Sequence, residues 1–401
     1  MKIVCIGAGA SGLFFSIHAS SFGHEVILLE SNAKVGRKIA ITGKGRCNIT
    51  NNCSATEFIN NVVTNPKFLY SAINGFTPSD TIEWFNNHGC PLKTERGNRV
   101  FPVSDKSFDI IDTLLREAKR AGTKIIYNEK VEDIYQSDSG FVIKTNNRKY
   151  DADNVVIATG GLSYHLTGST GDGYRFAKKL SHTVIEPKSA LCPIKIKEKI
   201  DKSMLDFTLK NVSLTASNES FNKSIFGDLE FLSHAITGPI AISMSSFINK
   251  VGDVNLSLDF KPALDEEKLD NRILRDIKDK PNENVSYLLR GLLPREIIPF
   301  FVINTKTDVE TVLNSFTKED RLKLVRDLKH FHFSFDGLDD IDKGIVTCGG
   351  VSVKEVNQQS MESKIIPGLY FIGEVLDVDA LTGGFNLQIA LSTAYAAASH
   401  I

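Results

Sequence analysis

The first thirty residues place two short apolar runs on either side of a longer segment with helical spacing. Lys2–Ile6 is rich in β-branched residues and Glu25–Leu29 is apolar after its first position, so both runs are typical of buried strands. Between them, Ser11–Phe22 carries apolar side chains at helical intervals, and Gly23 predicts where the helix ends. The pattern predicts a strand–helix–strand (βαβ) unit.

Further along, Ser107–Ala121 has the spacing of an amphipathic helix. Three short alternating runs then predict a small antiparallel meander: Val131–Tyr135, Gly140–Thr145 and Lys149–Asp151. Two short apolar runs, Asn154–Ala158 and Gly368–Ile372, are expected to return to the parallel sheet.

The pattern changes after Pro187. Four segments alternate like antiparallel strands: Ala190–Ile196, Leu209–Ala216, Lys223–Phe226 and Val254–Phe260. Pro262–Lys329 is charged and helical in period, with three internal prolines. This order predicts an α/β fold with a discontinuous Rossmann-like domain (1–188 and 346–401). It also predicts an inserted antiparallel, barrel-like β domain (189–261 and 330–345) and a small helical module (262–329).

A glycine-rich turn follows the first predicted strand. It reads Gly-Ala-Gly-Ala-Ser-Gly from Gly7 to Gly12 and fits G-x-G-x-x-G. Gly7 permits the tight turn, Gly9 lets backbone N–H groups approach a diphosphate, and Gly12 allows the helix to pack closely on the strand. Glu30 ends the second strand, where a carboxylate accepts hydrogen bonds from ribose hydroxyls. The unit predicts an adenine dinucleotide site; the alternative is a turn with no ligand.

Residues 36–51 read GRKIAITGKGRCNITN and have little periodicity. Arg37 and Lys38 are expected to neutralise phosphates, and Gly43 and Gly45 to let the backbone approach a planar ring. Arg46 and Asn48 supply polar groups. We interpret this stretch as a loop crossing a ligand; the alternative is a solvated basic loop.

Two other glycine pairs stand where backbone can meet a cofactor. Thr159-Gly160-Gly161 follows a predicted strand, and Gly383-Gly384-Phe385-Asn386 opens the predicted helix Leu387–Ala398. A helix N-terminus reached through glycines can hold negative charge with its N–H groups. The alternative for this helix is simple core packing.

Composition narrows the function classes. The 401 residues have a net charge of −1, so no nucleic acid partner is expected, and no apolar run is long enough for a membrane span. The start of the chain reads as a strand and not as a signal peptide. None of the six cysteines forms C-x-x-C or a zinc-ligand spacing, so reduced thiols, no metal and a cytoplasmic location are expected.

Three stretches resemble one bacterial flavoprotein family, the BaiN-like and aminoacetone oxidase-like FAD-dependent oxidoreductases. They are TGKGRCNITN (42–51), ATGGLSYHLTGSTGDGY (158–174) and ESKIIPGLYFIGEVLDVDALTGGFNLQIA (362–390). The resemblance spans the chain and implies FAD held by a dinucleotide fold of the glutathione-reductase type. It also implies that Val131 meets the adenine and that the C-terminal helix points toward the isoalloxazine ring.

The residues expected to bind the cofactor, from the patterns and the resemblance together, are Gly7, Gly9, Ala10, Ser11, Gly12, Glu30, Arg37, Lys38, Thr42, Gly43, Gly45, Arg46, Asn48, Val131, Thr159, Gly160, Gly161, Gly373, Glu374, Asp377, Gly383, Gly384, Phe385 and Asn386.

Three residues are candidates for the chemistry beside the ring. Tyr164 is a candidate pocket wall, His165 a candidate proton relay, and Asn386 a polar partner of the flavin. The alternative for His165 is an exposed loop histidine.

The function expected from these features is that of an FAD-dependent oxidoreductase acting on a small organic substrate. It would reduce an activated double bond with NAD(P)H as a transient donor, or oxidise an amine such as aminoacetone with O₂. The alternatives are a tRNA-modifying or nucleic-acid-binding flavoprotein and a protein that binds FAD without turnover. No pattern in the sequence indicates an oligomeric state.

Overall fold

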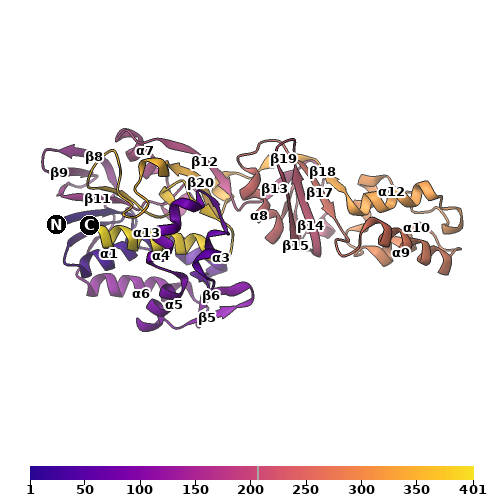
Figure 1. The fold of residues 1–401 in the computed structure, drawn as a ribbon, viewed down its shortest axis with the longest axis horizontal. Helices are drawn as coiled ribbons and strands as arrows, with labels where there is room; N and C mark the ends of the chain where they lie inside the picture. The colour runs from indigo at the N-terminus through magenta and orange to yellow at the C-terminus, as the bar shows by residue number, and fades with distance from the viewer. Residues whose placement is uncertain (206) are drawn as a thin grey trace. The chain divides into compact units, whose positions relative to one another are not determined.

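The computed structural model describes residues 1–205 and 207–401. The chain forms two compact units, Met1–Ala190 with Ile341–Ile401 and Leu191–Asp340. Figure 1 shows both, with the N- and C-terminal ends in the first.

The first unit is built around a five-stranded parallel sheet. Its order is β21 (Leu369–Phe371), β11 (Asn154–Ile157), β1 (Lys2–Ile6), β2 (Glu25–Leu29) and β7 (Lys124–Ile126). Helix α1 (Ala10–Ser21) joins β1 to β2, as the apolar pattern predicts. The Rossmann-like fold class is confirmed.

Helix α1 is buried because helices cover it from two sides. It packs against α13 (Phe385–His400) and α6 (Ser107–Arg120), and α13 in turn packs against α4 (Tyr70–Gly75). This explains why Leu13, Phe14 and Phe15 are all fully buried although they point in different directions around the helix. The N-terminal end of α13, which is also the end nearest the glycine pair 383–384, is thereby fixed in the first unit.

Smaller sheets surround this core. They are the meander β8 (Val131–Ser137), β9 (Gly140–Thr145) and β10 (Lys149–Ala152); the set β3 (Thr50–Asn51), β6 (Arg99–Pro102) and β5 (Leu92–Glu95); and the pairs β12 (Val184–Ala190) with β20 (Val346–Val351) and β22 (Asp379–Ala380) with β4 (Val62–Thr64). The remaining helices of this unit are α2 (Arg37–Ile41), α3 (Ala55–Ile59), α5 (Pro78–Asn87) and α7 (Asp172–Lys179).

The second unit contains a seven-stranded antiparallel sheet. Its order is β18 (Phe331–Phe333), β17 (Asn255–Asp259), β14 (Thr208–Ser217), β15 (Asn222–Leu232), β16 (Ala235–Thr237), β13 (Ile194–Ile196) and β19 (Phe335–Leu338). Helix α8 (Gly238–Ile248) packs on β14 and β15. Four further helices follow: α9 (Glu266–Asp279), α10 (Val285–Leu292), α11 (Ile298–Thr305) and α12 (Lys318–Lys329).

Two predicted strands differ from the observed ones. The predicted strand Ala190–Ile196 is wrong, because the chain breaks between β12 and β13, where Leu191 has a φ of +53° and Pro193 has no N–H to donate. The predicted strand Lys223–Phe226 extends to Leu232. Gly227 and Asp228, which are typical of a turn, lie inside β15, where the register to β14 shifts.

The helices and the sheet of the second unit share one apolar core. Phe260 beside the sheet and Phe301 of α11 both make ring contacts with Phe331 of β18. The predicted division of this region into a β domain and a separate helical module stays a prediction.

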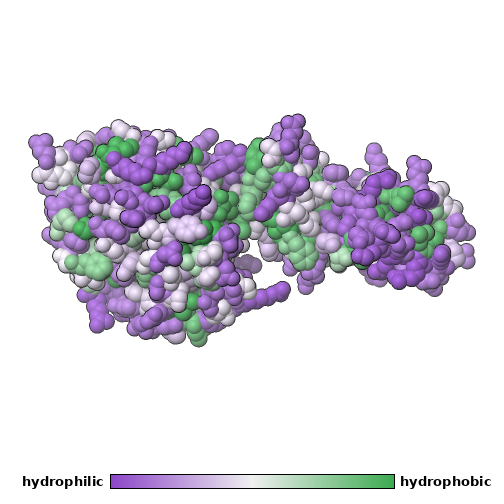
Figure 2. Space-filling model, viewed as in Figure 1, coloured by the Kyte–Doolittle hydropathy of each residue, from purple (hydrophilic) through white to green (hydrophobic). Residues whose placement is uncertain are grey.

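The surface of the visible face is largely hydrophilic, with smaller hydrophobic areas between (Figure 2). Among residues 1–205 and 207–401, no helix is both long and apolar enough to cross a membrane.

Candidate functional site

The turn between β1 and α1 has the close packing that the glycine pattern predicts. Gly7 has a φ of +103°, and a Cβ there would lie 2.6 Å from the Ala158 carbonyl oxygen. A Cβ on Gly12 would lie 1.9 Å from the Gly7 oxygen. Gly9 differs, because no heavy atom of the described residues lies within 4 Å of an added Cβ. Open space therefore adjoins the first turn of α1. No side chain of the described residues caps the N-terminus of this helix.

Glu30 connects this turn to the loop after β2. Its Oε2 accepts a hydrogen bond from the Ala8 N–H (2.9 Å), and its Oε1 accepts from the Asn32 N–H (2.8 Å). The Glu129 N–H donates to the Glu30 carbonyl (2.9 Å), which brings Val131 of β8 to the same region. Val131 is buried. The residues predicted to meet the ribose and the adenine are thus neighbours.

The two basic residues at the start of α2 have protein partners. Arg37 Nη1 donates to Asn32 Oδ1 (2.5 Å). Lys38 Nζ pairs with Glu374 Oε2 (2.7 Å) and donates to Ser163 Oγ (2.6 Å). The structure therefore gives Lys38 a carboxylate partner, whereas the sequence predicts a phosphate.

The turn after β11 contains a buried polar atom that has no partner among the described residues. Thr159 Oγ1 is buried and forms no hydrogen bond with any described residue. Gly160 has a φ of +73°, and a Cβ on Gly161 would lie 2.4 Å from Thr347 Oγ1. The orphaned hydroxyl in a glycine-lined turn is the kind of group that a cofactor satisfies.

Thr347 of β20 organises the same turn and is absent from the predicted site. Its Oγ1 accepts hydrogen bonds from the Leu162 N–H (2.8 Å) and the Ser163 N–H (3.0 Å), and its own N–H donates to Glu374 Oε1 (3.0 Å). The only sequence signal for it is the apolar run 346–351 with its paired glycines.

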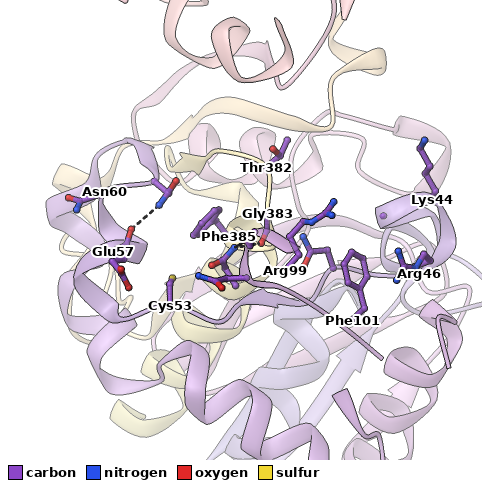
Figure 3. Close-up of a pocket in the computed structure, with 16 residues that line it drawn as sticks. Lys44, Arg46, Cys53, Glu57, Asn60, Arg99, Phe101, Thr382, Gly383 and Phe385 are labelled. Carbon is purple, nitrogen blue, oxygen red and sulfur yellow. Dashed lines mark hydrogen bonds between the residues drawn. The ribbon is translucent and has the colours of Figure 1, made fainter. Parts of the chain in front are cut away.

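A cavity of about 850 Å³ lies in the first unit and collects five of the predicted cofactor residues. These are Gly43, Arg46, Asn48, Gly383 and Phe385. Further polar residues line it: Lys44, Asn51, Glu57, Asn60, Asn61, Asn98, Arg99 and Thr382. Figure 3 shows Lys44, Arg46 and Phe101 on one flank, with Glu57 and Asn60 on the opposite flank. The sequence-based prediction did not include Arg99 or the other lining residues of the segment 97–101. The available signal there was Gly97 between Arg96 and Arg99.

The N-terminus of α13 forms part of this cavity. Gly384 has a φ of +98°, and a Cβ there would lie 2.3 Å from the Thr50 carbonyl oxygen. Asn51 Nδ2 donates to the Gly383 carbonyl (3.1 Å). No side chain of the described residues caps the helix, so its first N–H groups are available to a ligand.

The Asn386 side chain holds backbone. Its Oδ1 accepts from the Ala380 N–H (3.0 Å), and its Nδ2 donates to the Ala380 carbonyl (2.8 Å). The amide predicted to act on the flavin is therefore engaged in fixing the segment that precedes the glycine pair.

Gln388, two residues further along α13, anchors the start of the helix and was also missed. It is fully buried, and its Oε1 accepts from Thr50 Oγ1 (2.6 Å) and Thr81 Oγ1 (2.7 Å). Its Nε2 donates to the Phe76 carbonyl (3.1 Å) and to Ser392 Oγ (3.0 Å). All its hydrogen-bonding capacity on this face is used, which ties the first turn of α13 to β3 and α5.

The positive charge of Arg46 is neutralised by neighbouring carboxylates. It donates to Asp105 Oδ1 through Nε (2.8 Å) and Nη2 (2.6 Å) and also to Glu95, while its guanidinium lies 4.2 Å from the centre of the Phe101 ring. The hydrogen bond from Arg46 holds the pKa of Glu95 below its usual range. Asn48 Oδ1 accepts from the Val100 N–H (3.1 Å). Both side chains support the cavity wall.

Tyr164 and His165 do not line this cavity. Tyr164 has a φ of +55°. His165 Nδ1 lies 2.8 Å from Asp342 Oδ1, and the side chains of His165 and Asp342 are each about half exposed. The three residues predicted for the chemistry are therefore not brought together in it.

The remaining predicted residues lie close to these groups. Ala10 and Ser11 are in the first turn of α1, and a Cβ on Gly373 would lie 2.7 Å from Ser11 Oγ. Thr42 Oγ1 donates to the Ile39 carbonyl (2.8 Å) beside Gly45, and Asp377 Oδ2 accepts from Asn65 Nδ2 (3.0 Å).

Two cysteines lie at or near the cavity, Cys47 and Cys53. Burial raises the pKa of the Cys47 thiol to about 12 and that of Cys53, in the cavity wall, to about 11. Neither sulfur is therefore a ready nucleophile. Within the described residues, no cluster of His, Cys, Asp and Glu could hold a metal ion.

Comparison with known proteins gives consistent matches over the whole length. The family described as HI0933-like protein Rossmann domain matches residues 1–400. The ribosomal RNA dihydrouridine synthase of Haemophilus influenzae is 30% identical, covering 99% of this chain and 98% of that protein. The 3-dehydro-bile acid delta(4,6)-reductase of Clostridium scindens is 28% identical, covering 99% and 98%.

Among solved structures, the open conformation of a flavocytochrome c3 fumarate reductase aligns with a TM-score of 0.53. The identity is 18%, and the alignment covers 99% of this chain and 77% of that one. This is a likeness of fold.

Proposed function

The chain belongs to the HI0933-like family of Rossmann-fold, FAD-dependent oxidoreductases, and on that premise we propose that it reduces a carbon–carbon double bond conjugated to a carbonyl group. The reactions in the names of the two relatives are both of this type. Dihydrouridine is uridine with the C5=C6 bond saturated beside a carbonyl, and a delta(4,6) reductase of a 3-dehydro-bile acid acts on bonds conjugated to a 3-oxo group. Such reductions add hydride at the carbon remote from the carbonyl and a proton at the nearer carbon.

The residues present fit FAD. The open space beside Gly9 at the N-terminus of α1 suits the diphosphate, and Glu30 lies where the ribose is expected. The unpartnered Thr159 hydroxyl gives a further polar contact. The uncapped N-terminus of α13 at the cavity favours negative charge on a ligand. FAD, when bound, supplies the hydride.

The polarity of the cavity lining favours one class of substrate over the other. Lys44, Arg46 and Arg99 and five asparagines line it, against only three side chains of apolar character, Cys53, Phe101 and Phe385. Burying an apolar steroid against Lys44, Arg99 and the amides of Asn60 and Asn98 would leave these polar groups without partners. A uracil base in RNA, with its carbonyls, N–H group and adjacent phosphates, suits the lining better.

We therefore favour RNA uridine over the small organic substrate expected from the sequence, which becomes the second candidate. The net charge of −1 is compatible with RNA because the cavity lining itself carries Lys44, Arg46 and Arg99 against one carboxylate, Glu57. NADH or NADPH is the proposed source of electrons.

The test compares substrates on the same preparation of FAD-loaded protein. Ribosomal RNA fragments and a 3-oxo steroid with a conjugated double bond are each incubated with NADH or NADPH, and aminoacetone is incubated with oxygen. A gain of two hydrogens by uracil, detected by mass spectrometry of digested RNA, supports the proposal. Conversion of the steroid or of aminoacetone, with RNA unchanged, would contradict it in favour of the small-molecule candidate.

A further inference from the structure

Two of the three cations at the cavity have no carboxylate partner among the described residues. Lys44 and Arg99 are exposed and form no ion pair with any of residues 1–205 and 207–401. Arg46 differs, since Glu95 and Asp105 neutralise it and Lys93 completes a balanced cluster with these two carboxylates. The uncompensated positive charge of the cavity therefore comes from Lys44 and Arg99.

The local structure holds Arg99 toward the cavity. Arg99 begins β6, and its Nε donates to the Arg96 carbonyl (3.0 Å) across the Gly97 turn. Its guanidinium lies 5.9 Å from the centre of the Phe101 ring. With Nε engaged, the two terminal nitrogens can donate to an outside acceptor, and a planar pair of donors matches phosphate oxygens.

Lys44 belongs to the loop that lines the same cavity. It has a φ of +58° between Gly43 and Gly45, and its side chain is exposed. In Figure 3 the Lys44 side chain lies on the flank opposite Glu57. The Glu57 carboxylate is itself engaged by the N–H and hydroxyl of Ser54, both at 2.9 Å. These hydrogen bonds keep the carboxylate charged but hold it at the start of α3, where among the described residues it forms no ion pair with Lys44 or Arg99.

We propose that Lys44 and Arg99 form a phosphate-binding subsite that holds a phosphodiester next to the reacting uridine. The inference rests on the proposed function, because it gives the RNA backbone its contact at the site where the base is reduced. Contacts to phosphate position an RNA without reading its sequence. Lys44 and Arg99 thus fix the strand, and the side-chain amides of Asn60 and Asn98 in the lining remain available for the base.

The experiment measures binding of a fluorescein-labelled oligouridylate to FAD-loaded protein by anisotropy at several salt concentrations. Lys44→Gln and Arg99→Gln are each expected to weaken binding about tenfold at low salt. Each should reduce the slope of log affinity against log salt by about 0.7, the value for one phosphate contact on a single strand. With RNA as substrate, KM should rise while kcat at saturation and the flavin absorbance spectrum stay unchanged.

Arg96→Gln is the matched control. Arg96 lies in the same turn but does not line the cavity, so binding should be unaffected. Lys44→Arg keeps the charge and should retain most of the affinity. Arg99→Lys keeps the charge but loses the planar pair of donors, so its salt slope should match the wild type while its affinity lies between those of the wild type and Arg99→Gln. Both variants separate loss of charge from misfolding.

The outcomes separate the subsite from the reaction. Uracil reduction by the wild type, with unchanged binding and salt slope in both glutamine variants, would overturn the subsite and leave the reaction standing. Salt-dependent binding that both variants weaken, with no reduction of uracil in any RNA, would support the subsite and overturn the proposed reaction.

Discussion

Lys38 and Glu374 are 336 positions apart in the sequence and form an ion pair at 2.7 Å. The pair joins the start of α2 to the turn after β21, and Ser163 and the Thr347 N–H complete the set of hydrogen bonds around it. Both side chains are about four-fifths buried. Three segments that surround the predicted cofactor site are therefore held together by one carboxylate.

Glu374→Gln is expected to lower the free energy of unfolding by about 1–3 kcal/mol, because it leaves the Lys38 ammonium without its counter-charge in a largely buried place. Urea unfolding monitored by circular dichroism measures the change. The control is Glu132→Gln, which removes an exposed pair with Lys144 and should have little effect on stability. Equal effects of the two substitutions would show that the buried pair has no special weight.

Gly9→Ala and Gly12→Ala should separate ligand binding from packing. The added methyl group of the Gly9 variant meets no atom of the described residues, so the fold should keep its stability. FAD affinity should fall, because the methyl group enters the space assigned to the diphosphate. The Gly12 variant clashes with the Gly7 carbonyl and should destabilise the protein itself. Flavin release measured by fluorescence, together with urea unfolding of the apoprotein, reads both effects. Undiminished FAD affinity in Gly9→Ala would contradict the placement of the diphosphate at this turn.

Gly384→Ala is expected to destabilise the protein by about 2 kcal/mol or more, because the methyl group would overlap the Thr50 carbonyl and the residue has a φ of +98°. Gly75→Ala in α4 is the control. Its added Cβ meets no described atom, so stability should stay unchanged or rise by up to about 1 kcal/mol. The midpoint of thermal unfolding compares the two variants.

Gln388→Leu should cost about 2–4 kcal/mol. It leaves the Phe76 carbonyl without the amide donor and the hydroxyls of Thr50 and Thr81 without their acceptor in a buried region. The same change at the exposed Gln136 of β8 should have little effect. Guanidinium unfolding of both variants tests this, and a neutral Gln388→Leu would mean that the network does not stabilise the start of α13.

His18 predicts a dependence of stability on pH. Burial, with a smaller contribution from His88, lowers the pKa of His18 from 6.5 to about 4, and no described residue pairs with its Nε2. The unfolded chain therefore binds a proton that the folded chain excludes, so this contribution is present above pH 6.5 and is lost as the pH falls toward 4. The loss is on the order of 3 kcal/mol.

His18→Phe should flatten the fall in stability over this pH range. The site suits the larger ring, because Phe14 and Tyr395 already contact the imidazole at ring-centre distances of 4.5 and 5.0 Å. Urea unfolding of both proteins at several pH values is the measurement. Parallel curves would show that other groups cause the acid sensitivity.

The sequence was most informative where the structure is local. The βαβ unit, its glycine turn and Glu30 lie within thirty residues, so apolar spacing and glycine chemistry were sufficient to predict them. The break at Leu191 and the strand through Gly227 were missed, because tertiary pairing overrode the local signals there.

The candidate site was only partly predictable for the same reason. Gly43, Arg46 and Gly383 were expected to share a ligand and do line one cavity. The partners that give Lys38, Arg46 and Asn386 their contacts could not be read from spacing, since each contact depends on how distant segments meet. Arg99 was missed because an arginine beside a turn has no distinctive pattern until the cavity is known.

The order of elements along the chain also constrains when this site can form during synthesis. Helix α13 follows every other described element, yet it packs on α1 and supplies Gly383 and Phe385 to the cavity. A nascent chain from which α13 has not yet emerged leaves buried residues of α1 without their cover. Flavin incorporation is therefore expected to come after translation of α13, and chaperones that bind exposed apolar helices would act on the chain before that point.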